Sequence, residues 1–291
     1  MRLDDGRESE NVEDRRGQGY GGGGMGGGRM VVGGGLGTVV LVLLALFLGV
    51  DPGVILSGGG GQLAPQEQQA PAQRPPQDDA AARFVSRVLA ETEDVWNPVF
   101  RSLGRQYENP RLVLFSGATE SGCGVAQSQV GPFYCPNDQR VYIDLGFMAQ
   151  LQRTLGANGD FASAYIIAHE VGHHVQNQLG VLRRVDQLRQ HASEAEANAL
   201  QVRVELQADC LAGFWARRAQ EARNILEQGD IEEGLNAAAA VGDDRLQRRA
   251  RGTVQPESFT HGSSEQRARW FRRGLESGRL EACDTFAPER L

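Results

Sequence analysis

The sequence of 291 residues contains no lysine, and all 30 of its basic residues are arginine. Acidic residues outnumber them at 37, which gives a formal net charge of −7 at pH 7. A protein that reads nucleic acid needs clustered positive charge to meet the phosphates. The charge balance therefore argues against a dedicated nucleic-acid binder, and we expect no nucleic acid among the partners.

The sequence also lacks the C-x-x-C pattern, which excludes a cysteine-rich zinc knuckle and a thioredoxin-type redox site. Its four cysteines are an even number, as expected for two disulfides in an oxidising compartment. Three pairings are formally possible. Cys123 and Cys135 flank a short, turn-rich segment, which favours pairing them with each other, and Cys210 would then pair with Cys283.

No basic residue occurs between Arg29 and Arg74, and this interval begins with an uncharged apolar run at residues 30–50. Such a run is about as long as a helix needs to cross a bilayer. Because nearby positive charge lies only before the run, we expect an uncleaved transmembrane anchor, a cytoplasmic N-terminus and an exported remainder. A cleaved signal peptide is the alternative, but no A-x-A site closes the run.

The composition divides the rest of the chain into three parts. Residues 1–29 are charged and then glycine-rich, so we expect them to be disordered. Residues 51–80 are rich in glycine, proline, glutamine and alanine, which is typical of a flexible linker. Residues 81–291 have the pattern of a folded domain, and their number is normal for a single core.

Periodicity within this domain predicts a mostly helical α+β fold with a small antiparallel sheet. Short runs of β-branched and aromatic residues predict strands at 111–117 and 140–147. Asp160 is a plausible N-cap, and Gly180 a plausible end, for a helix that carries the motif described next. Helices are expected at about 82–103, 160–179, 193–228, 231–250 and 263–277.

Only five histidines occur, yet three of them fall within the stretch IIAHEVGHHVQNQLG at residues 166–180. His169 and His173 are four residues apart, so on a helix their rings lie one turn apart on one face and can meet one ion. Glu170 can reach a water molecule at that ion. This is the H-E-x-x-H pattern of zinc hydrolases. The alternative is a buried helix whose histidines only satisfy local hydrogen bonds.

A catalytic zinc ion takes three protein ligands and leaves one position open. The metzincin extension is absent, because Gln176 and Leu179 stand where that class needs glycine and histidine. The segment VELQADC offers a carboxylate instead: Glu205 can be the third ligand, while Asp209, one turn later, accepts the free ring N–H of a histidine ligand. The alternative is a pair of solvated carboxylates, but the apolar neighbours of the pair indicate burial.

Peptide hydrolysis passes through an oxyanion, and a positioned donor lowers that barrier. His261, just before the helix expected at 263–277, is a candidate donor, with Arg267 as a rival or supporting charge. A surface-loop histidine or a helix cap is the alternative reading of His261. We expect His174 to serve in packing or to support a ligand, and His191 to be exposed.

Five segments together resemble the bacterial family of neutral zinc metallopeptidases, over nearly the whole chain apart from the linker. They are HEVGHHVQ, VELQADCLAGFWA, GPFYCPNDQRVYIDLGF, THGSSEQRARWF and ESENVEDRRG. The resemblance implies a membrane-anchored, zincin-like domain with His169 and His173 as zinc ligands and Glu170 as catalytic base. Glu205 and Asp209 are similar to the corresponding pair of the wider glutamate-liganded zincins.

The sequence thus predicts a membrane-anchored zinc metallopeptidase that hydrolyses peptide bonds, with Glu170 as the general base for a zinc-activated water. The strand near 140–147 is expected to hold a peptide or protein substrate by edge pairing. An inactive, zinc-stabilised scaffold that binds a partner protein or envelope component is the alternative, as is an amide hydrolase of the cell wall. A scaffold, however, has no need of Glu170. The oligomeric state and the natural substrate stay open.

Overall fold

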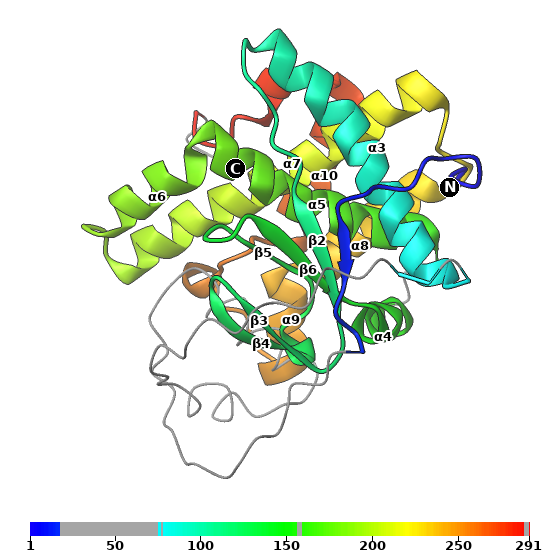
Figure 1. Ribbon diagram of the computed structural model, residues 1–291. Coiled ribbons are helices and arrows are strands. Elements are labelled where there is room, and N and C mark those ends of the chain that lie inside the picture. The colour runs from blue at the N-terminus through cyan, green and yellow to red at the C-terminus, as the bar shows by residue number, and fades with distance from the viewer. Residues whose placement is uncertain (18–74, 77, 156–158, 288–290) are drawn as a thin grey trace.

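The structure is a computed structural model that describes residues 1–17, 75–76, 78–155, 159–287 and 291 (Figure 1). The apolar run at 30–50 and most of the predicted linker lie outside these residues. In the part of the chain that the structure describes, no helix combines the length and the apolar character needed to span a bilayer.

Helices form most of the domain, with α5 at its centre (Figure 1). Together with one face of the sheet they enclose the main hydrophobic core, and a smaller hydrophobic cluster lies on the other face of the sheet. Helix α5 packs against α3, α7 and α8, and α10 packs along α7. The helices are α3 Ala80–Ser102, α4 Leu145–Leu155, α5 Asp160–Leu179, α6 Val181–Arg189, α7 Glu194–Arg223, α8 Asp230–Ala240, α9 Asp243–Arg251 and α10 Ser264–Ser277. Short 3-10 turns are η1 Ser128–Val130, η2 Pro256–Ser258 and η3 Leu280–Cys283.

The main sheet has four strands in the order β1-β2-β6-β5, and β3 and β4 form a separate hairpin. The prediction of an antiparallel sheet is wrong for the main sheet, because β1, β2 and β6 are parallel and only β5 runs against β6. Between β2 and β6 the chain forms the β3–β4 hairpin and then β5. Strand β5 runs opposite to β2, and β6, which reverses direction once more, is therefore parallel to β2. The strands are β1 Val12–Asp14, β2 Arg111–Phe115, β3 Ala118–Ser121, β4 Gly124–Gln127, β5 Phe133–Cys135 and β6 Arg140–Asp144.

The first 17 residues, which we call the N-terminal strap, are ordered against the domain. The expectation of disorder is wrong for them, because β1 pairs with β2 and the Ser9 hydroxyl donates to Glu93 of α3 at 2.5 Å. Val12 is only 5% exposed. One crossing at residues 30–50 would put the strap and the domain on opposite sides of a membrane. A cytoplasmic N-terminus with an exported domain is therefore incompatible with the pairing of β1 and β2.

Several predicted helices match the structure closely, and the exceptions have local causes. Helix α5 ends at Gly180 in the left-handed conformation, with φ 81°, as predicted. Its N-cap is Gly159, while Asp160 is the first helical residue. Helix α7 stops earlier than expected, because Asn224 adopts the left-handed conformation with φ 54°. The helix expected at 231–250 is broken at Val241 and the following glycine into α8 and α9, and α4 and α6 were not predicted.

Two disulfides confirm the favoured pairing: Cys123 bonds to Cys135, and Cys210 bonds to Cys283. The first joins the turn of the β3–β4 hairpin to the end of β5. The second ties α7 to η3 near the end of the chain. Structural disulfides persist in oxidising compartments, so they indicate a location outside the cytoplasm.

Candidate metal centre

The two helices that carry the predicted ligands approach closely at Gly172. A Cβ atom at this position would lie 3.1 Å from the carbonyl oxygen of Ala208 and 3.2 Å from its Cα. A side chain there would push α5 and α7 apart, so glycine allows the backbones to come together. The close approach brings the histidine face of α5 to the carboxylate face of α7.

Three predicted ligand atoms meet between these helices. The Glu205 Oε2 atom lies 3.2 Å from His169 Nε2 and 3.7 Å from His173 Nε2. The three residues form a cluster whose ligand atoms all lie within 4.8 Å of one another. Ligand atoms about 2.0–2.1 Å from a tetrahedral zinc ion are roughly 3.3 Å apart. The donor set therefore fits a zinc ion, and the two distances from Glu205 are close to this spacing.

Asp209 supports the first histidine ligand from behind. Its Oδ1 atom lies 2.9 Å from His169 Nδ1, and its carboxylate is fully buried. Because a carboxylate only accepts hydrogen bonds, this contact places a proton on Nδ1 and leaves Nε2 for the metal. Tyr165 also donates its hydroxyl to Asp209. The sequence-based role of Asp209 agrees with this position.

Arg267 also faces Asp209. Its Nε donates to Oδ2 at 2.8 Å and its Nη2 to Oδ1 at 2.9 Å, while the side chain is almost completely buried. A two-point contact of this kind is geometrically specific and holds the carboxylate in its ionised form. This position favours a role in fixing Asp209 over the alternative role as an oxyanion donor.

Burial and charge give the acidic groups of the centre opposite properties. Desolvation opposes ionisation of Glu205, but the neighbouring imidazoles of His173 and His169 outweigh it and hold its pKa well below the usual range. Desolvation dominates at Glu170 and raises the pKa of its carboxyl group. The histidine ligand His169 is affected in the same way as Glu205. Burial opposes its positive charge, but the hydrogen bond to Asp209 outweighs burial and raises the pKa of the ring to about 10 in the metal-free protein.

His261 lies in a buried loop that Asp243 organises. The fully buried Asp243 carboxylate accepts the backbone N–H groups of Thr260, His261 and Gly262, and it lies 3.2 Å from His261 Nδ1. Burial of the ring opposes its protonation, but Asp243 outweighs it and raises the pKa of His261. The charge of His261 in turn contributes to the lowered pKa of Glu205, so the ring acts within electrostatic reach of the centre.

A family model described as "Putative neutral zinc metallopeptidase" matches residues 1–286 of the chain. The chain belongs to this family. It is 50% identical over 286 residues to uncharacterized protein YpfJ of Escherichia coli K12, covering 98% of this chain and 99% of that protein. It is 44% identical over 258 residues to uncharacterized protein Rv2575 of Mycobacterium tuberculosis H37Rv, and the match covers 85% of this chain and 86% of that protein. No solved structure gives a significant match.

The sequence analysis did not identify several side chains that form hydrogen bonds to the candidate ligands or to their partners. Tyr165 and Gln176 lie on the ligand face of α5, Gln201 precedes Glu205 by one turn on α7, and Asp243 begins α9. Gln201 donates to Glu205 Oε1 at 2.8 Å. Helical spacing from the ligands could have indicated the first three. Asp243 had no such signal, because its partners come from a loop almost 20 residues later.

The other two expectations about histidines are confirmed. His174 is buried, with Nδ1 3.1 Å from the Tyr134 hydroxyl and Nε2 2.6 Å from the carbonyl oxygen of Glu108. It therefore packs α5 against β5 and the loop before β2. His191 lies exposed after α6.

The expectation of substrate pairing with the strand at 140–147 is wrong, because β6 lies between β2 and β5 and both of its edges are occupied. Strand β5 ends the sheet next to α5. In the described part of the chain, no strand pairs with its outer side.

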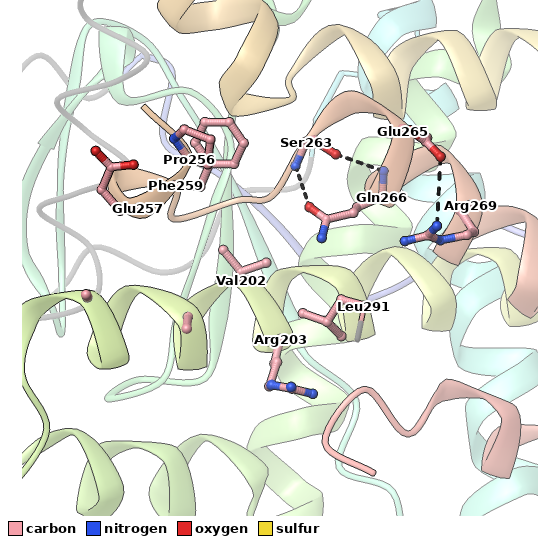
Figure 2. Close-up of a pocket in the computed structure, with 12 residues that line it drawn as sticks. Val202, Arg203, Pro256, Glu257, Phe259, Ser263, Glu265, Gln266, Arg269 and Leu291 are labelled. Carbon is pink, nitrogen blue, oxygen red and sulfur yellow. Dashed lines mark hydrogen bonds and ion pairs between the residues drawn. The ribbon is translucent and has the colours of Figure 1, made fainter. Parts of the chain in front are cut away.

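A cavity of about 560 Å³ lies outside the metal centre, between the first half of α7, η2 and the start of α10 (Figure 2). None of the three candidate ligands lines it. Ser263 and Gln266 exchange hydrogen bonds beside it and form a capping box that begins α10 (Figure 2). This cap fixes the helix that carries Arg267, so the cavity wall supports the centre without being part of it.

Proposed function

We propose that this protein is a zinc-dependent peptidase whose metal is held by His169, His173 and Glu205. The observation that carries the proposal is the convergence of three ligand atoms from two helices beside the buried Glu170. Zinc bound there would supply Lewis-acid chemistry, which polarises a carbonyl group and lowers the pKa of water.

Glu170 is the proposed general base. It follows His169 directly, about 100° further round the helix, and its raised pKa makes it a stronger base than an ordinary carboxylate. It takes a proton from the attacking water as the new C–O bond forms. It then delivers that proton to the amine nitrogen as the peptide C–N bond breaks.

His261 is the proposed donor to the oxyanion, and Asp243 is its positioning residue. With Nδ1 held by Asp243, the raised pKa favours the ring form that carries protons on both nitrogens. The second N–H, on Nε2, is then a charged donor for developing negative charge. We propose that an extended peptide lies along the outer side of β5, which borders α5.

The test is Glu170→Gln in the full-length protein, with a mixed peptide library as substrate. We expect zinc to stay bound and peptide cleavage to fall by about 10²–10⁴-fold, because only the proton acceptor is lost. Glu221→Gln on the exposed face of α7 is the matched control and should cleave normally. His169→Ala and Glu205→Ala should lose zinc as well as activity, and a chelator should abolish cleavage by the parent.

Three outcomes separate the possibilities. Cleavage by Glu170→Gln at the parental rate would contradict the assignment of the base. A parent that holds zinc but cleaves no peptide would support the scaffold instead. Failure of the parent to bind zinc would remove the whole proposal.

A further inference from the structure

We propose that Gln176 is a positioning residue that fixes the tautomer of His173. This inference rests on the metal-binding part of the proposed function, but not on peptide cleavage. The Gln176 side chain is fully buried, and its Oε1 atom lies 2.8 Å from His173 Nδ1. An amide oxygen can only accept, so this contact requires a proton on Nδ1 and leaves the Nε2 lone pair for the metal.

The orientation of the amide follows from its other contacts. An amide carries its acceptor on one side and its two donors on the other. Gln176 Nε2 lies 2.8 Å from the carbonyl oxygen of Val204 and 3.1 Å from Oε1 of Gln207. A flipped amide would turn its oxygen toward the Val204 carbonyl, where two acceptors would face each other. The backbone of α7 therefore selects the orientation that presents Oε1 to His173.

Gln207 of α7 favours the same orientation of the Gln176 amide, because η3 fixes its own amide. Its Nε2 donates to the carbonyl oxygen of Cys283 at 3.0 Å, which turns its Oε1 toward Gln176. Cys283 is held in place by its disulfide with Cys210. A backbone carbonyl can only accept a hydrogen bond. The carbonyls of Val204 and Cys283 therefore fix the direction of the hydrogen bonds that link Gln207, Gln176 and the ring of His173.

The neutral charge of Gln176 also has a physical reason. Three carboxylates, from Glu170, Glu205 and Asp209, are already buried around the centre. Within the part of the chain that the structure describes, Asp209 is the only one of these three carboxylates that forms an ion pair with a buried arginine. A carboxylate in place of Gln176 would add uncompensated buried charge, which is costly. An amide orients the ring without that cost.

The test compares zinc affinities of Gln176→Met and the parent by competition with a chromogenic chelator. Methionine keeps the length of the side chain but cannot accept the ring N–H. We expect about 10–100-fold weaker zinc binding, as for other residues that orient metal-ligating histidines. Gln178→Met, two residues along the same helix with no ligand contact, is the matched control and should bind zinc like the parent.

A second measurement reads the tautomer directly. In the ¹⁵N spectrum of the metal-free parent, at a pH where the ring is neutral, His173 should carry its proton on Nδ1. A proton on Nε2 would overturn the inference, and this arm decides even if Gln176→Met fails to fold. Parental zinc affinity in a less stable Gln176→Met would show a packing role only and would also overturn it. A parent that binds no zinc would overturn the proposed function and this inference together.

Discussion

Arg267 shows how the role of one residue depends on which partner occupies its polar atoms. Two of its nitrogens contact the Asp209 carboxylate, and Nη2 also lies 3.2 Å from the hydroxyl of Tyr165. The guanidinium therefore compensates a fully buried negative charge. Removing one partner of such a pair leaves the other charge buried alone, which is strongly destabilising.

Arg267→Gln should therefore lower the free energy of unfolding by about 3–5 kcal/mol and weaken zinc binding. Urea denaturation and chelator competition measure the two effects. Arg269→Gln, on the exposed side of α10 with Glu265 3.8 Å away, is the control and should change stability by less than about 1 kcal/mol. A stable, zinc-loaded Arg267→Gln with a reduced turnover rate would instead indicate an oxyanion role.

The candidate site was predictable to the extent that its residues share a helix. Spacing of four residues defined His169 with His173, and Glu205 with Asp209, and the structure brings both pairs together. The partners of Asp243 could not be predicted, because loop backbone groups have no signature in side-chain sequence. The orientation of Gln176 was equally inaccessible, since it depends on carbonyl groups of α7 and η3.

At the scale of elements, the N-terminal strap is the part of the fold that the sequence concealed. Its few apolar residues give no periodic pattern, and its partners lie on α3 and β2, far along the chain. Polar contacts hold it: Arg16 contacts Asp79 at 2.5 Å, and Arg7 contacts Glu93 of α3 at 2.7 Å. Local composition therefore favoured disorder, whereas long-range ion pairs and strand pairing produced order.

The strap should detach in acid. Burial opposes ionisation of Asp14, but the hydrogen bonds from Arg16 outweigh burial and lower the pKa of Asp14. The pKa of Asp79 is lowered by a hydrogen bond from the backbone of Ala82 and, to a smaller extent, by Arg16. A lowered carboxyl pKa contributes stability above the unfolded value of about 3.9, and that stability is lost as pH falls below it.

Hydrogen-exchange protection of the β1 amides should therefore fall below about pH 4, relative to that of β6. In Arg16→Gln we expect β1 to be less protected already at neutral pH, with a weaker dependence on acid. Equal protection of β1 at pH 3 and pH 7 in the parent would contradict the role of these ion pairs.

At the scale of the whole molecule, the two disulfides close loops of very different length. Cys210 and Cys283 are 73 residues apart, whereas Cys123 and Cys135 are 12 apart. Loop-closure entropy predicts losses of about 4 and about 3 kcal/mol when the respective bonds are removed.

Replacing Cys210 and Cys283 with serine should also weaken zinc binding, because the Cys283 carbonyl orients Gln207. The Cys123→Ser, Cys135→Ser double variant is the control and should keep its zinc affinity. Thermal unfolding and chelator competition on both double variants provide the comparison. Equal zinc affinities in the two would indicate that η3 stays in place without its disulfide.

The strap and the domain belong to one body, so both should lie on the same side of any membrane. The absence of lysine allows a direct test, because an introduced lysine is a unique side-chain amine. Asp5→Lys and Glu265→Lys place it on exposed positions of the strap and of α10. A membrane-impermeant amine reagent should label both lysines alike in intact cells, with the parent as control. Labelling of Glu265→Lys alone would contradict the pairing of β1.

The place of β1 in the sheet also has a consequence for biosynthesis. Val12 pairs with Leu112, so β1 must wait for a partner that is translated a hundred residues later. Until then its backbone groups are unpaired and open to other chains. Closing so large a loop makes this pairing a late event in folding. Correct folding of this protein thus requires β1 to stay unpaired during synthesis until β2 has been translated.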